Sequence, residues 1–178
     1  MKSDVILIDN QGNGFADAVE ETKRAAEFRG LEPKQAIQLQ LLTEEMLSMA
    51  RSVTGEMKAS FWLESDVKAF DLHMTTKTVM DKEKRYMLIS SATSRKNEAA
   101  NSFLGRLRDA FEQAMAAEVD HTYYELPQEL SADVPNHYTD DQEWDRYERS
   151  ILRRLADNIK IDIRGGLVHM AVSKRFDK

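Results

Sequence analysis

The chain has 178 residues, 42% of them hydrophobic, which is enough to bury a sizeable core, and a single domain over residues 1–178 is the default expectation. It contains no cysteine, which excludes disulfides and thiolate chemistry and suits a reducing compartment. No apolar run approaches the length of a bilayer span, and the N-terminus lacks a signal-peptide pattern, so we expect a cytoplasmic protein that does not enter the membrane.

The net charge of −6 is concentrated in one segment. Residues 118–145 contain nine Asp or Glu and no Lys or Arg, so the rest of the chain has a slight excess of basic residues. No basic stripe interleaved with aromatic residues is present, which argues against nucleic-acid binding. The acidic segment has two interpretations: it is a solvated surface, or it is a docking face for a basic protein partner.

The N-terminal part predicts a strand followed by a helix. Residues 4–9 (DVILID) are apolar and rich in β-branched side chains, which is typical of a strand. After a turn cluster that includes Gly12 and Gly14, apolar residues recur at helical spacing over 15–29, and Gly30 is placed to end this helix. The turn lacks the third glycine, and any Lys-Ser/Thr pair, of the known phosphate-binding loops, so we interpret it as a turn.

Residues 33–53 carry the strongest helix signal in the chain. At about 100° of turn per residue, the apolar side chains form an arc broad enough for a helix that packs on two sides. The arc comprises Ile37, Leu41, Leu42, Met46, Met49 and Val53. Glu45 falls inside it, one turn after Leu41 and one turn before Met49. Desolvating a lone carboxylate costs on the order of several kcal/mol, so Glu45 is either a core-edge residue with a partner or an acid that faces a cleft.

Residues 58–64 and 67–75 predict an antiparallel hairpin. Every second residue is apolar in both strands, which places Ala59, Phe61 and Leu63 on one face of the first strand and Phe70, Leu72 and Met74 on one face of the second. Asp71 and His73 fall on the opposite face of the second strand. A short connection with matching alternation predicts a sheet with one buried side.

After the first hairpin, residues 77–118 are predicted to be mostly helical, with a break near 90–97, and residues 118–141 to be irregular. Residues 143–158 predict another helix. The strands 159–164 and 167–175, joined by a Gly165-Gly166 turn, predict a second hairpin. The element order predicts an α+β fold. We expect a two-layer sandwich in which a mixed, mainly antiparallel sheet carries helices on one face, with a helical and acidic insertion at about 77–141.

The sequence shows no metal-binding or nucleophile motif. The four histidines have no i, i+4 pair and no carboxylate at metal-ligand spacing: His73, His121, His137 and His169. We therefore predict no metal site. Ser48, Ser90 and Ser91 lack a glycine elbow or a paired histidine, so a serine nucleophile is not expected.

The element order and the motif LLTEEMLSMA (residues 41–50) resemble the ATP-binding domain of the gyrase/histidine-kinase (GHKL) superfamily, most closely its small anti-sigma-factor serine-kinase branch. The resemblance covers most of the chain outside 77–141, including the closing helix and hairpin over 151–176. In that family a long helix carries a Glu followed four residues later by a metal-binding Asn. The resemblance implies that Glu45 is the catalytic residue that activates water or a hydroxyl, with Met49 at the Asn position.

Three nucleotide-binding features of the family are altered in this chain. Its adenine-reading Asp-x-Gly-x-Gly loop follows a hairpin, which here ends in Thr75, Thr76 and Lys77. Its glycine-rich phosphate loop precedes the last helix, where this chain has Arg149-Ser150 and no glycine nearby. A methionine thioether cannot replace the hard oxygen ligands that Mg²⁺ requires, and phosphates need the close backbone approach that glycine permits.

These departures make ATP hydrolysis or kinase activity improbable. With the resemblance, they imply a non-catalytic regulatory module, without metal or nucleotide cofactor, that binds protein partners through residues 77–145. The alternative is an ATP-binding protein or serine kinase that uses ATP with Mg²⁺. Its pocket would be rebuilt around Glu45 from Thr75, Thr76, Lys77 and the arginines near Arg149. Both hypotheses leave open whether the chain forms a homodimer.

Overall fold

The computed structural model of the protein describes residues 1–54, 58–101, 105–106, 108–110, 112 and 151–176. In chain order the elements are β1 (Ile6–Asp9), α1 (Phe15–Phe28), α2 (Pro33–Thr54), β2 (Lys58–Ser65), β3 (Ala69–Lys77), α3 (Lys82–Ser91), the 3-10 helix η1 (Glu98–Asn101), β4 (Asn158–Arg164) and β5 (Leu167–Arg175). Residues 151–155 are also helical. The predicted strands, hairpins and first two helices are confirmed, and the helix predicted over 143–158 is described only from residue 151.

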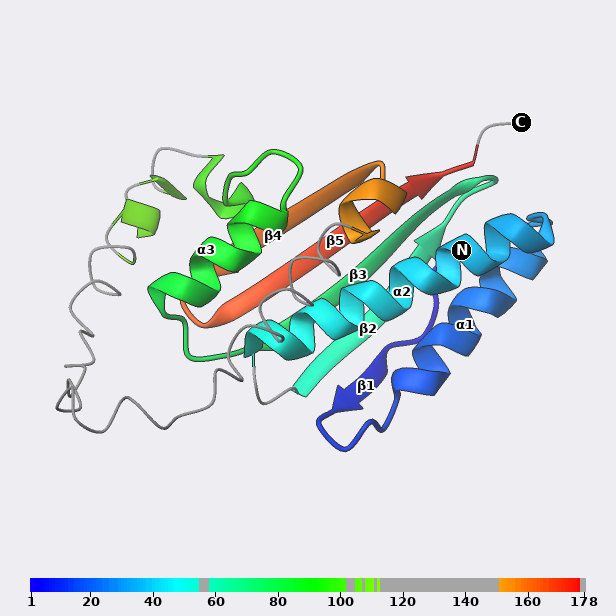
Figure 1. Ribbon diagram of the computed structural model, residues 1–178, viewed down its shortest axis with the longest axis horizontal. Coiled ribbons are helices and arrows are strands. Elements are labelled where there is room, and N and C mark those ends of the chain that lie inside the picture. Colours follow the sequence, from blue (N-terminus) through cyan, green and yellow to red (C-terminus); the bar gives the residue numbers. More distant parts are fainter. Residues whose placement is uncertain (55–57, 102–104, 107, 111, 113–150, 177–178) are drawn as a thin grey trace, which may run out of the picture.

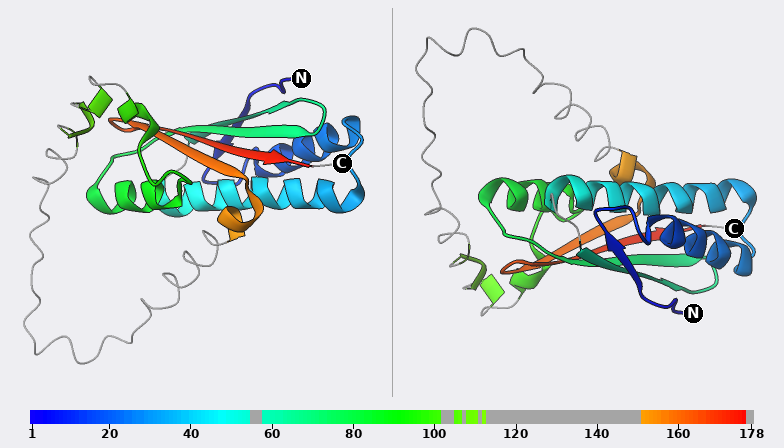
Figure 2. Two further views of the ribbon diagram at one scale, coloured as in Figure 1. Left: turned by 90° about the horizontal axis from the view of Figure 1, so that it is seen from above. Right: turned by 90° about the horizontal axis from the view of Figure 1, so that it is seen from below.

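The fold is α+β, with one five-stranded sheet in the order β1-β2-β3-β5-β4 (Figure 1). All four ladders between described strands are antiparallel, which corrects the expectation of a mixed sheet. Helices α1, α2 and α3 lie on the same side of the sheet, so the structure has two layers (Figure 2). Within the described residues, no helix has the length and hydrophobicity needed to cross a bilayer.

Alternation along the strands determines which side chains meet the helices. In β2 and β3 the buried residues recur at every second position, and Phe61 pairs directly with Met74. Because directly paired residues of an antiparallel ladder share a face, both side chains point toward the helices. The intervening residues, which include Trp62 and His73, lie on the other face, and we call that face the outer face of the sheet.

The buried face of α2 differs from the arc expected from the sequence. Ile37 and Leu41 are 58% and 42% exposed, although both belong to the predicted arc. The other described members of the arc, Leu42, Met46 and Met49, are buried as predicted. The buried side also extends to residues outside the arc: Ala36, Leu39, Thr43, Leu47 and Ala50. The predicted arc is wrong at its Ile37–Leu41 side because α1 packs against the side of α2 that carries Thr43, which contacts Thr22 of α1.

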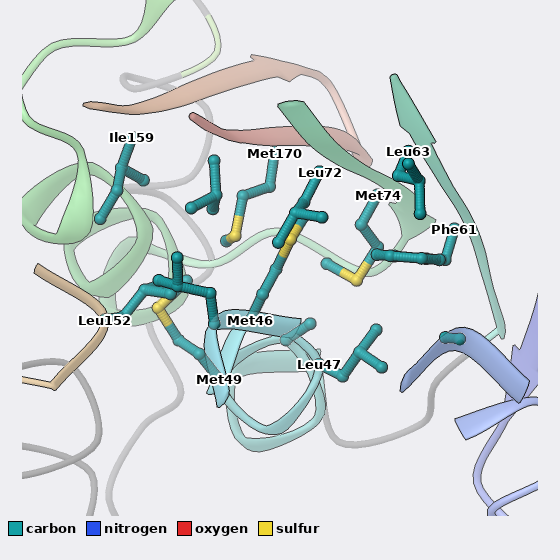
Figure 3. Packing of buried hydrophobic residues seen from close by; sticks show 14 of the residues in the cluster. Met46, Leu47, Met49, Phe61, Leu63, Leu72, Met74, Leu152, Ile159 and Met170 are labelled. Atoms are coloured by element: carbon teal, nitrogen blue, oxygen red, sulfur yellow. The ribbon is translucent and has the colours of Figure 1, made fainter. Parts of the chain in front are cut away.

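The core is one continuous cluster between the sheet and the helices (Figure 3). Side chains of α2 such as Met46 and Leu47 meet strand residues such as Leu72 and Met74. Leu152, in the helical residues 151–155, is fully buried in the same cluster. The predicted insertion begins where β3 ends, and α3 and η1 belong to its described part. The acidic segment, residues 118–145, lies entirely outside the described residues.

Candidate functional site

Glu45 lies at the border between the buried and exposed sides of α2. At about 100° per residue it falls between the exposed Leu41 and the buried Met49. Its side chain is partly exposed, while its Oε2 atom is shielded from solvent. Glu45 therefore lies at the edge of the core, which is the position that the core-edge interpretation expects.

Met49 is part of the hydrophobic core. Its side chain is 2% exposed and extends into the cluster on the side of Leu152, beside Met46 (Figure 3). Burying a methionine side chain contributes about 1.5–3 kcal/mol relative to leaving it in water. The position that the family resemblance assigns to a metal ligand is thus occupied by a side chain that packs against apolar neighbours.

The three residues at the end of β3 do not share one surface. Thr76 is buried on the helix side, where its hydroxyl donates a hydrogen bond to the Lys58 carbonyl oxygen at 3.2 Å. Thr75 and Lys77 occupy the alternate positions and lie on the outer face, opposite His169 and Leu167 of β5. β3 continues to Lys77, two residues beyond its predicted end, so the side chains of these residues alternate between the two faces of the sheet.

The structure brings Glu45 and Met49 together on α2 but places Thr75 and Lys77 on the far side of the sheet from them. Arg149 and Ser150, the remaining predicted pocket residues, lie outside the described residues. In this strand register, Thr75 and Lys77 do not lie on the same side of the sheet as Glu45.

A second group of chemically active side chains lies on the outer face, where we did not predict a site. The rings of Trp62, His73 and His169 are nearly parallel, with centroids 5.0–5.8 Å apart. His73 Nδ1 and His169 Nε2 are 3.3 Å apart, within hydrogen-bond distance. Lys2 lies 5.4 Å from the centre of the Trp62 ring and forms an ion pair with Glu64 at 3.0 Å.

Burial lowers the pKa of both imidazoles. For His73 the second cause of the lowered pKa is repulsion from His169, while Glu64 and Asp71 oppose the shift. For His169 burial again dominates, and the nearby Asp162 opposes it. The lowered pKa values favour the neutral form of both rings, in which one ring nitrogen can donate a hydrogen bond to the other. Across the described residues, no three His, Cys, Asp or Glu side chains are placed to hold a metal ion.

The sequence contained part of the signal for this group. Alternation in β3 already placed His73 on the face opposite the apolar residues. What could not be inferred was that β5 pairs with β3, which places His169 opposite Thr75 and next to His73. Spacing along the sequence can reveal a histidine pair only within one helix or strand. This pair joins two strands that are far apart in the chain.

The comparisons with known proteins do not assign the chain to a family. No protein-family model matches it, and no curated protein matches its sequence. The fold and the positions of the side chains are therefore the basis on which its function is proposed.

Proposed function

We propose that this chain is a regulatory protein-binding module and a non-catalytic relative of the GHKL ATPase domain. In this proposal a core side chain, Met49, occupies the former nucleotide site. The observation that carries the proposal is the burial of Met49, which is 2% exposed and packs in the core on the side of Leu152. In the family this position supplies a metal ligand. Here it supplies an apolar contact.

Metal chemistry supports this reading of Met49. Mg²⁺ binds hard oxygen ligands in near-octahedral geometry and retains several waters, so it needs a polar and hydrated cavity. A thioether surrounded by leucine and methionine side chains offers neither ligand nor water. Without a metal site beside it, Glu45 has no means of acting on a metal-bound phosphate.

The strand register supports the same conclusion for the adenine side of the site. Thr76 is buried and its hydroxyl is already hydrogen-bonded to the Lys58 carbonyl oxygen. Thr75 and Lys77 are on the outer face. The end of β3 therefore turns two of its three predicted side chains away from Glu45, and the third, Thr76, has no anionic oxygen with which to recognise a purine amine.

The partner that the chain would bind is a basic protein surface. Residues 118–145 hold nine acidic residues and no Lys or Arg, a density that attracts positive charge over the range of a Debye length. Two exposed apolar side chains occur at the start of the proposed contact region 77–145: Val79, 85% exposed, and Tyr86, 74% exposed. Exposed apolar side chains are typical of surfaces that bind other proteins.

Calorimetric titration with ATP and Mg²⁺ tests the loss of nucleotide binding. We expect no ATP hydrolysis at millimolar nucleotide, and no binding of ATP that requires both Mg²⁺ and Glu45. A ligand at one hundred times its dissociation constant would add about 2.7 kcal/mol to the free energy of unfolding, so thermal unfolding gives a second readout. Mg²⁺-dependent ATP binding that Glu45→Gln weakens, or a soaked crystal with an adenine nucleotide beside Glu45, would overturn the proposal in favour of the ATP-binding alternative.

Affinity capture from the native cytoplasm tests the partner. We expect a basic protein in stoichiometric amount, lost when Asp140, Asp141, Glu143 and Asp145 are changed to their amides. The matched control changes exposed acids of α1, Glu20→Gln with Glu27→Gln, and should retain the partner. Recovery that is equal in both variants, or absent in the wild type, contradicts the proposal.

A further inference from the structure

A cationic cavity lies between α3 and the helical residues 151–155. It has a volume of about 650 Å³, which is within the usual range of small-molecule sites. Four of its lining side chains are basic: Lys82, Arg85, Arg95 and Arg153. Among the described residues no acidic side chain and no residue of α2 lines it, so it is separate from Glu45. Tyr86 and Ile89 add an aromatic ring and an apolar wall.

Arg85 forms the fixed part of this cavity. It is only 6% exposed and forms an ion pair with Asp109. Asp109 also accepts a hydrogen bond from the Asn97 side chain. Because its partner is itself held, the guanidinium loses little freedom when a ligand binds.

The loop that carries Arg95 is held against the sheet edge. Asn97 exchanges two hydrogen bonds with the backbone of Ile163 in β4, at 2.9 and 2.8 Å. Thr93 does the same with Ile159, through its backbone N–H at 2.9 Å and its hydroxyl at 2.8 Å. These bonds fix the loop on both sides of Arg95.

Arg95 itself has a φ of 54°, and it is the one non-glycine residue with positive φ in the described part of the chain. The left-handed conformation is unfavourable for a residue with a Cβ atom, and such strain is concentrated at functional sites. Lys82, Arg95 and Arg153 are exposed, and no ion pair joins any of them to a described acid. Like charges that surround one cavity attract an anion to it.

We propose that this cavity binds a small molecule that carries two or more phosphoryl groups and a ring. Arginine guanidinium groups bind phosphoryl oxygens with two parallel hydrogen bonds, and several cations are needed to balance more than one phosphoryl group. The ring stacks on or packs against Tyr86 and Ile89. The site is independent of the nucleotide position on α2, and its ligand is recognised without a metal.

Titration calorimetry with inorganic tripolyphosphate, in low salt and without magnesium, tests the proposal on the full chain. We expect one site per chain, an affinity that falls with added salt, and binding of inorganic phosphate that is at least about tenfold weaker. Arg153→Gln and Arg95→Asn should each weaken tripolyphosphate binding by about tenfold or more, since each removes a charged hydrogen-bond donor.

Matched controls lie next to both arginines. Arg154→Gln and Lys96→Gln remove exposed charges that do not line the cavity, and they should weaken binding much less than Arg153→Gln and Arg95→Asn do. Glu45→Gln should leave the affinity unchanged, which separates this site from ATP binding at α2. Absence of tripolyphosphate binding, equal affinity for phosphate, or equal losses in the control variants would each overturn the proposal. Thermal unfolding confirms that each variant folds, and the two arginines give independent tests.

Discussion

His73 and His169 are 96 residues apart in sequence, yet His73 Nδ1 and His169 Nε2 are 3.3 Å apart on the outer face of the sheet. The pair is covered on one side by Trp62, whose ring is stacked with both imidazoles. Charged groups around it are Glu64, Asp71 and Lys2 near His73 and Asp162 near His169. The neutral form of both rings is favoured because each is half-buried and a charge on one repels a charge on the other.

This pair predicts a loss of stability on mild acidification. The pKa of each imidazole in the folded protein is below the usual 6.5. As the pH falls below that value, the unfolded chain binds protons before the folded protein does, so the free energy of unfolding decreases toward the lower folded-state pKa values. Urea unfolding between about pH 7.5 and 5.5 measures the effect.

The double variant His73→Gln with His169→Gln should show a weaker pH dependence over the same range. NMR titration provides the direct check, with His73 expected to titrate below the value of a free histidine. A His73 resonance that titrates above that value would contradict the assignment of burial as the main cause.

Met49→Ala should destabilise the protein by about 2–5 kcal/mol, because it removes a buried side chain and leaves a cavity in the core. Ile37→Ala on the same helix is the matched control. Ile37 is 58% exposed, so its removal should change the free energy of unfolding by about 0.5 kcal/mol or less. Chemical denaturation of both variants measures the difference, and equal effects would show that Met49 does not belong to the core.

Asn97→Ala should lower the free energy of unfolding by about 1–3 kcal/mol for each Ile163 backbone group that it leaves unpaired and buried. Asn97 is 4% exposed and supplies both hydrogen bonds to that residue of β4. Ser94→Ala in the same loop is the control, since Ser94 is exposed and its bond to Glu98 is on the surface. Hydrogen exchange at the Ile163 amide should increase in the Asn97 variant and not in the Ser94 variant.

Gly14→Ala should destabilise the chain much more than Gly12→Ala. Both glycines have positive φ, 78° and 86°, so a Cβ atom costs about 1–2 kcal/mol at either position. At Gly14 the added Cβ would lie 2.0 Å from the Leu7 carbonyl oxygen, whereas nothing lies within 4 Å at Gly12. The additional loss at Gly14 therefore comes from displacing the backbone of β1 against α1. Thermal unfolding of the two variants distinguishes this close approach from the strain that they share.

Local patterns in the sequence determined the elements. Alternation in residues 58–64 and 67–75 predicted the hairpin and its buried face, because a strand presents successive side chains to opposite sides. Pro33 and Gly30 marked the start of α2 and the end of α1, since each residue has the backbone conformation that a helix boundary needs. These features depend on neighbours in the chain, so the sequence contains them directly.

Tertiary packing decided which sides of those elements are used. Thr22 of α1 and Thr43 of α2 form a buried hydroxyl contact at 3.0 Å, which places Thr43 inside and leaves Ile37 outside. Both sides of α2 carry apolar residues, so its periodicity alone cannot choose between them. In the same way, only the pairing of β5 with β3 brings His169 to His73, and only the fold brings Arg153 to α3. Such contacts join residues from distant parts of the chain, and the free energy of the whole core selects them.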